Sequence, residues 1–140
     1  MEVHVEIEGL QELREHFNYV SQSVKDALGE TALAGADIIR DDARSRAPRD
    51  TGKLREGIIS EVVWFKHTTK AFAGCGMDAD MNDIFVKHNK AGKRFYYPAS
   101  VEYGTSTAEA HPFLRPALDN NKAKVKRMIA EKIRAIIEGG

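Results

Sequence analysis

The sequence predicts an α+β fold: a single domain in which one mostly antiparallel sheet packs against a long central helix and a C-terminal helix. Three observations support this prediction. Apolar and polar residues alternate at the start of the chain, two long stretches repeat apolar residues every three or four positions, and β-branched and aromatic segments lie between them. A chain of 140 residues is typical of one domain, so we expect residues 1–140 to form one unit.

The first predicted element is a strand over Val3–Ile7, because its apolar residues alternate with acidic and polar ones until Gly9. From Leu10 the apolar residues recur at helical steps, and Ser21 is suited to be an N-cap that divides this stretch into a short and a long helix.

The long helix is rich in alanine and is predicted to run from Gln22 to close to Arg46. The residue before Pro48 is disfavoured in helical geometry, which sets this end. A turn over Pro48–Gly52 follows, because proline, aspartate and glycine cluster there.

The middle of the chain is predicted to hold strands Ile58–Phe65 and Ala71–Gly76, joined as a hairpin around Lys66–Lys70. Met77–Arg94 is polar and has no clear period, so we expect a long, flexible loop there. Phe95–Tyr103 is aromatic and is predicted to be a strand or a short helix.

The last predicted element is an amphipathic helix that extends to Gly139 and has Pro116 in its first turn. No run of apolar residues is long enough to span a membrane, and the acidic start of the chain does not resemble a signal peptide.

Charge is balanced overall but segregated along the chain. Lysine and arginine number 21, as do aspartate and glutamate, so the formal net charge is zero. This balance argues against a dedicated nucleic-acid-binding protein, which usually has a basic excess. Glu2–Glu15 is acidic, whereas Lys87–Arg94 and Lys122–Arg134 are basic. We therefore expect unlike patches of neighbouring copies to meet and to close into a ring.

The candidate motifs for catalysis, cofactors or metals are each incomplete. Gly52–Gly57 has the glycine spacing of a phosphate loop but lacks the lysine that follows it. Asp78 opens a calcium-like pattern, but Asp83 replaces the glycine that the turn needs. The five histidines lack ligand spacing, and Cys75 lies in a predicted strand as a small buried thiol. We therefore predict no catalytic, cofactor-binding or metal-binding residues and no enzyme activity.

Two motifs are more informative about the family than the overall composition is. The first is Ala-Pro-Arg-Asp-Thr-Gly-Lys-Leu-Arg-Glu-Gly-Ile at 47–58, directly after the long helix. The second is Val-Glu-Tyr-Gly-Thr at 101–105, followed by Pro-Phe-Leu-Arg-Pro-Ala at 112–117. In this order and spacing, they resemble the tail-completion, or head–tail joining, family of minor structural proteins in long-tailed bacteriophages and prophages. The chain departs from that pattern at Gly57, where the family usually has serine.

The resemblance implies a non-enzymatic virion protein that forms a ring between the head connector and the tail tube and completes the tail. By the same resemblance, the ring is expected to be a hexamer or a dodecamer. Its partners would be further copies of itself, connector or head-completion proteins, and tail-tube or tail-terminator proteins. DNA could pass through its lumen with passive contact. The protein would be found in the virion, and in the host cytoplasm during assembly, without a membrane partner.

The residues expected to carry the family pattern or a subunit contact are Pro48, Asp50, Thr51, Gly52, Leu54, Arg55, Glu102, Tyr103, Gly104, Thr105, Pro112, Phe113, Arg115 and Pro116. The loop residues expected to face a DNA lumen or a neighbouring copy are Lys87, Lys90, Lys93 and Arg94.

Several of these residues have specific expected roles. Asp50 and Thr51 are suited to cap the turn that Gly52 begins, and Gly104 to let the chain reverse after a strand. Arg115 is expected to pair with Glu102, within or between subunits.

Apolar burial between subunits is expected from Leu54, Tyr103 or Phe113. Fold stability, rather than contact with a partner, is an equally open role for every motif residue.

Two other functions are left open by the sequence. One is a nucleic-acid-binding module that uses the basic loop at 87–94 and the C-terminal helix; it would bind duplexes in a salt-dependent way. The other is a small hydrolase that uses Cys75 or a histidine.

Overall fold

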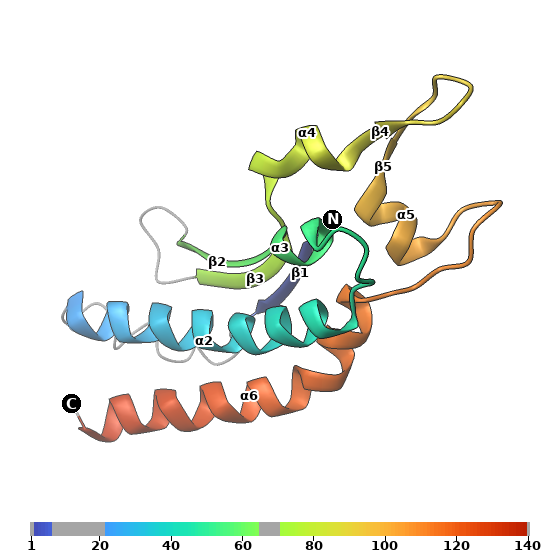
Figure 1. Cartoon of the computed structure of the whole chain (residues 1–140). Coiled ribbons are helices and arrows are strands. Elements are labelled where there is room, and N and C mark those ends of the chain that lie inside the picture. Colours follow the sequence, from blue (N-terminus) through green and yellow to red (C-terminus); the bar gives the residue numbers. More distant parts are fainter. Residues whose placement is uncertain (1, 7–21, 65–70, 140) are drawn as a thin grey trace.

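The computed structural model describes residues 2–6, 22–64 and 71–139 (Figure 1). In chain order, the elements are β1 (Glu2–Glu6), α2 (Gln22–Arg46), α3 (Lys53–Glu56), β2 (Ile58–Trp64), β3 (Ala71–Met77), η1 (Ala79–Met81), α4 (Asn82–Phe85), β4 (Val86–His88), β5 (Arg94–Tyr96), α5 (Tyr97–Tyr103) and α6 (Leu114–Gly139). The predicted α+β fold is confirmed, including the long central helix and the C-terminal helix.

Some predictions fall outside the described residues: the helix after Leu10, the Ser21 cap, the turn Lys66–Lys70 and most of the acidic segment Glu2–Glu15.

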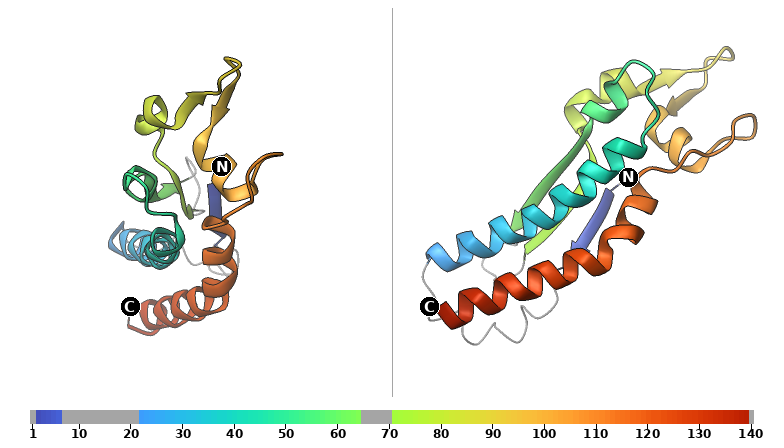
Figure 2. Two further views of the ribbon diagram at one scale, coloured as in Figure 1. Left: turned by 45° about the vertical axis from the view of Figure 1, so that its right-hand side comes forward. Right: turned by 60° about the horizontal axis from the view of Figure 1, so that its bottom comes forward.

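The three-stranded sheet has the order β1-β3-β2 and is antiparallel throughout. Residue Cys75 on the central strand lies opposite Val3 on one side and Ser60 on the other, which fixes the register. Helix α2 packs against β2 and β3 (Figure 2). Ile58 and Ala73 are buried together with Cys75, so the sheet contributes one face of the core.

Helices α2 and α6 run antiparallel and side by side (Figures 1 and 2). Their close approach depends on small residues of α2, because a Cβ at Gly35 would lie only 2.7 Å from a methyl carbon of Val125. Ala36 and Ala43, on the same side of α2, are fully buried. Gly35 therefore lets α6 pack closely against α2, and the buried alanines add small core residues on the same helix.

Polar contacts fix α2 on both sides. The amide of Asn121 on α6 donates to Asp42 at 2.6 Å, and Arg46 donates to the same carboxylate at 3.1 Å. On the sheet side, Ser60 donates to Asp37, and Arg40 bonds both of these side chains. Burial alone would raise the pKa of Asp42, but the bonds from Arg46 and Asn121 outweigh it and hold this pKa below its ordinary value.

The prediction of a long loop over Met77–Arg94 is wrong for most of this segment. The chain forms η1, α4 and β4 there, and β4 pairs with β5 as a second, two-stranded antiparallel sheet. These elements have only three or four residues each, which is too short to give a visible period. Flexibility of this segment stays a prediction.

The stretch Phe95–Tyr103 combines both predicted alternatives. It continues β5 to Tyr96 and then forms α5, with Pro98 in the first turn of the helix. The short helix α3, directly after the predicted turn, was not expected.

Candidate functional site

The second motif centres on the buried carboxylate of Glu102, which is only 5% exposed. Its Oε2 accepts hydrogen bonds from the backbone N–H groups of Phe113 at 2.7 Å and Leu114 at 3.0 Å. Its Oε1 accepts one from the N–H of Arg115 at 2.9 Å. These groups lie at the start of α6, where a helix leaves its first N–H groups without partners and favours negative charge. Glu102 is therefore the N-terminal cap of α6, supplied from α5.

Pro116 completes this arrangement. It occupies the third position of α6 and has no N–H group, so the first turn has no further donor that needs an acceptor. Phe113 and Leu114, between the cap and the proline, are fully buried. Each part of the Pro-Phe-Leu-Arg-Pro-Ala motif thus contributes to one helix start.

The expected pairing of the Arg115 side chain with Glu102 is wrong. Glu102 accepts a bond from the backbone N–H of Arg115, while the guanidinium of Arg115 is exposed and lies 3.7 Å from the carboxylate of Asp119, one turn further along α6. A buried carboxylate is better satisfied by three fixed N–H groups than by a long side chain that would have to leave water.

Gly104 ends α5 with φ 75° and ψ 177°. A side chain is excluded there, because a Cβ would lie 2.8 Å from the backbone nitrogen of Ala110. Gly104 follows a helix and not a strand as expected, and the tight turn comes directly after it, where the N–H of Thr105 donates to the carbonyl oxygen of Ala108. The hydroxyl of Thr105 accepts a bond from the N–H of Ala108, and the N–H of His111 donates to the carbonyl oxygen of Val101, so the 104–112 loop is closed at its base.

The first motif fastens the end of α2. The guanidinium of Arg55 donates two hydrogen bonds, of 3.0 and 2.8 Å, to the carbonyl oxygen of Ala47, just past the last residue of α2. Arg44 donates two bonds to the carbonyl oxygen of Ile58, at the start of β2. Cations suit a helix C-terminus because unpaired carbonyls collect there. Leu54 is buried between these contacts and adds apolar packing.

Gly52 has φ 85°, a left-handed conformation that glycine adopts without strain. The expected cap is present in part: the hydroxyl of Thr51 accepts a bond from the N–H of Lys53 at 3.3 Å. Asp50 makes no such bond to the described residues.

Gly57, the departure from the family pattern, accommodates a residue of the 77–94 segment. A Cβ at Gly57 would lie 2.5 Å from the ring of Phe85, which is almost completely buried. The carbonyl oxygen of Gly57 also accepts a bond of 2.7 Å from the N–H of Asp78. The missing side chain at 57 therefore makes room for the ring that anchors α4.

The β4–β5 hairpin projects from the body of the molecule, and the 104–112 loop projects from the same end (Figures 1 and 2). Asn89 organises the turn of the hairpin. Its side-chain oxygen accepts bonds from the N–H groups of Ala91 and Lys93. Its backbone N–H donates to the carbonyl oxygen of Lys93, and its carbonyl oxygen accepts from the N–H of Gly92. The tip is thus a defined turn and not a structureless segment.

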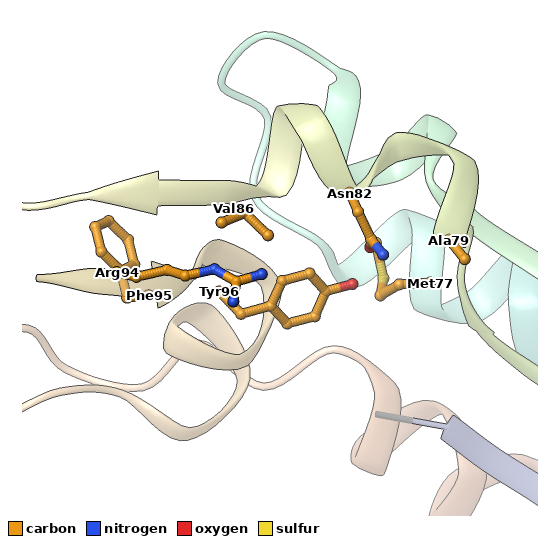
Figure 3. A pocket seen from close by; sticks show the side chains of 7 residues that line it. All are labelled: Met77, Ala79, Asn82, Val86, Arg94, Phe95 and Tyr96. Atoms are coloured by element: carbon orange, nitrogen blue, oxygen red, sulfur yellow. The ribbon is translucent and has the colours of Figure 1, made fainter.

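The four cations grouped together in the sequence have different surroundings. The ammonium of Lys87 lies over the ring of Tyr97, 4.8 Å from its centre, and is held against the body. Arg94 extends along an open hollow of about 540 Å³ between the hairpin and α4 (Figure 3). Lys90 and Lys93 are exposed at the tip.

The hollow also contains Tyr96, whose ring meets Phe85 edge to face at 6.3 Å between centres. Burial raises the pKa of the Tyr96 hydroxyl. In Figure 3 this hydroxyl points toward Met77.

The structure divides the predicted motif residues into buried, partly buried and exposed ones. Leu54, Glu102 and Phe113 are buried, so the expectation that Leu54 and Phe113 supply burial between subunits is wrong. Tyr103 is 72% exposed and is the motif residue with an accessible aromatic surface. The other exposed motif residues are Asp50, Thr51, Thr105, Pro112 and Arg115, and the partly buried ones are Pro48, Gly52, Arg55, Gly104 and Pro116.

Sequence reasoning missed Arg44, Phe85, Asn89 and Asn121, all of which make contacts described above. Asn89 had a signal, because asparagine before Lys-Ala-Gly is typical of a tight turn. The partners of the others are 14 to 79 residues away in sequence, and no local pattern indicates them.

The described residues do not form a reactive thiol site or a metal site. Cys75 is buried, and burial raises the pKa of its thiol to about 11, which opposes formation of a reactive thiolate. Within residues 2–6, 22–64 and 71–139, no group of three acidic, histidine or cysteine side chains could hold a metal ion. No helix in that part of the chain is long and apolar enough to cross a membrane.

Comparison with protein families gives one match. The family model described as "Bacteriophage HK97-gp10, putative tail-component" matches residues 11–104, well over half of the chain. No curated protein and no solved structure matches the chain. The matched range includes the whole first motif and Glu102, the capping residue of the second. The chain therefore belongs to the HK97-gp10-like family of bacteriophage tail components.

Proposed function

We propose that this protein forms a ring at the head–tail junction, or at the head-proximal end of the tail, and completes the tail so that it can join the head. The role is structural and not catalytic. The family supports the coarser part of this proposal, a component of the phage tail in the virion. The observation that carries the finer part is the pair of projections, the hairpin and the 104–112 loop, at one end of a packed body (Figure 1).

Projections of this kind suit a subunit that meets neighbours on more than one side. The 104–112 loop begins next to Tyr103 and ends three residues before Arg115, and both of these side chains are exposed. Tyrosine and arginine are enriched among the residues that dominate binding energy at protein interfaces. In this proposal, the buried motif residues position the loop, and the exposed ones contact a partner.

The partners in this proposal are further copies of the chain, in a ring of six or twelve, together with connector or head-completion proteins and tail-tube or tail-terminator proteins. DNA would pass through the lumen. The ring would reside in the virion after assembly from subunits in the host cytoplasm.

The experiment is complementation of a phage that lacks the gene. The lysate without the protein should contain filled heads and complete tails that fail to join, or tails with a defective end, under the electron microscope. Normal infectious particles in that lysate would contradict the proposal.

Tyr103 tests whether the exposed motif residues matter. Tyr103→Ala should fold normally, because the side chain is 72% exposed, yet complement poorly. Tyr103→Phe is the matched control, because it keeps the aromatic ring of the side chain. Equal particle yields from the two variants would remove Tyr103 from the proposed contact.

A nucleic-acid-binding module is the second candidate, and the exposed cations of α6 favour it. They are Lys122, Lys124, Arg127, Lys132 and Arg134. This candidate predicts that the protein binds duplex DNA with an affinity that falls steeply as salt rises. Absence of binding at 50 mM salt would exclude it.

A further inference from the structure

The hairpin tip, residues 89–93, and the helical run at its base carry opposite charges. Lys90 and Lys93 are exposed at the tip, and Asp80 and Asp83 are exposed on η1 and α4. None of these four side chains forms an ion pair with the described residues. The acids of α2 differ, because Asp37, Asp41 and Asp42 pair with arginines of their own helix.

An exposed apolar residue lies within the acidic group. Ile84 is 43% exposed and is one of two large hydrophobic side chains exposed in the described residues. It lies four positions after Asp80 in one helical run, a spacing that places these two side chains near each other, and it directly follows Asp83 in the sequence. Ile84 also borders a small hollow of about 40 Å³ that includes Asp50 and Thr51 of the first motif. Two lysines line the same hollow, but Lys53 pairs with Glu56 and Lys87 lies over the ring of Tyr97. We call Asp80, Asp83 and Ile84 the acidic edge.

The tip points away from its own acidic edge. β4 leads directly away from α4, and its three residues, Val86 to His88, span about 10 Å before the turn at Asn89 begins. The hydrogen bonds around Asn89 hold the turn in a defined shape. Cations at the tip and carboxylates at the base are therefore available to partners outside the protomer.

We propose that the hairpin tip of one copy docks on the acidic edge of the next copy. The two lysines would pair with Asp80 and Asp83, while Ala91 and Gly92, which have little or no side chain, would let the turn approach Ile84. A contact between unlike surfaces is heterologous, and its repetition closes a ring. This inference rests on the proposed ring function and names one of its subunit contacts.

Charge complementarity favours a second copy over DNA as the occupant of the tip. The protein has equal numbers of acidic and basic residues, and carboxylates at the base of the hairpin would repel phosphates that approach it. Binding of DNA is the competing outcome of the test.

The first test uses charge exchange in the full-length protein. Lys90→Glu/Lys93→Glu and Asp80→Lys/Asp83→Lys should each weaken self-association on the order of tenfold, measured by sedimentation velocity across a concentration series. The chain that carries all four substitutions should recover it. Lys122→Glu/Lys124→Glu on α6 changes the net charge as Lys90→Glu/Lys93→Glu does and should have no effect. Failure of the fourfold variant to recover would overturn the proposal.

The second test traps the contact. Ala91→Cys in one preparation and Ile84→Cys in another should form a disulfide dimer only when they are mixed and treated with diamide, which accepts the two electrons and two protons of the thiols. Cys75 should not take part, because it is buried. Replacing Ile84→Cys by Lys124→Cys in the mixture gives the control. Cross-linking no greater than in that control would overturn the contact.

The outcomes separate this inference from the proposed function and from DNA binding. If cross-linking succeeds but the gene deletion leaves normal particles, the contact stands and the head–tail role fails. If particles are lost in the deletion but the charge exchange does not rescue assembly, the role stands and this contact fails. If the tip substitutions instead reduce binding of a fluorescent DNA duplex, and the fourfold variant does not assemble, the tip is a DNA contact.

Discussion

Replacing Glu102 tests most directly whether the second motif is a helix cap. Glu102→Ala removes the acceptor of three N–H groups, and two of these, on Phe113 and Leu114, belong to buried residues. A buried donor without a partner costs about 1–3 kcal/mol. Because the three bonds share one carboxylate, their costs do not add fully, and we expect a loss of about 3–5 kcal/mol.

That loss is a large part of the total stability of a typical domain, about 5–15 kcal/mol. It should lower the melting temperature by roughly 10 °C or more. Glu102→Gln keeps one oxygen acceptor but loses the negative charge at the helix start, and its NH₂ group meets a backbone donor. We expect a smaller loss of about 1.5–3 kcal/mol for it.

The assay is urea unfolding followed by far-ultraviolet circular dichroism, with amide hydrogen exchange at residues 113–115. Glu109→Ala is the control, because Glu109 is exposed in the neighbouring loop and should change stability by less than about 0.5 kcal/mol. Exchange at 113–115 should accelerate in Glu102→Ala more than exchange in α2. If Glu102→Ala is as stable as Glu109→Ala, the carboxylate does not cap α6.

Three further predictions concern single residues. Gly57→Ser, which restores the usual residue of the family, should lower the free energy of unfolding in urea by about 1–3 kcal/mol, because a Cβ would overlap the Phe85 ring. In the Phe85→Ala background the same substitution should cost less, and equal costs in the two backgrounds would contradict the contact. Gly104→Ala should lose about 2–3 kcal/mol and Gly92→Ala only about 1 kcal/mol, because both have positive φ but only Gly104 also lacks space for a Cβ; similar losses would show that space does not matter. The Cys75 thiol should react slowly with a disulfide reagent at pH 8 until urea is added, and stability should fall between about pH 9 and pH 11, because the thiol ionises near 9.0 when unfolded but near 11 when folded; fast reaction in the native state would contradict its burial.

The long helices could be predicted from the sequence because their signals are local. The α2 prediction ended close to Arg46, where the structure ends it, since the restriction before Pro48 acts on the neighbouring residue alone. Pro116 was likewise placed correctly in the first turn of α6. Periodic apolar residues over 25 or more positions leave little ambiguity.

The contacts of the motifs could not be predicted in the same way. Sequence reasoning paired Glu102 with Arg115 by charge, whereas the carboxylate bonds backbone groups that every residue type has. It interpreted Gly57 as a local departure, whereas the glycine makes space for Phe85, 28 positions later. In both cases the partner is decided by tertiary packing, which residue types and spacing do not reveal.

Contacts of motif residues attach both projections, the β4–β5 hairpin and the 104–112 loop, to the body of the molecule. The hairpin begins directly after Phe85, whose ring is fixed against Gly57, and Lys87 holds its first strand against Tyr97. The 104–112 loop lies between Glu102 and the helix start that Glu102 caps. Each projection is therefore attached to the body at a point that motif residues stabilise.

Consequently, substitutions at buried motif positions should affect assembly by displacing a projection, and such variants should regain assembly at low temperature, where they are folded. Exposed positions such as Tyr103 should show no such temperature dependence, because their loss removes a contact and leaves the fold unchanged.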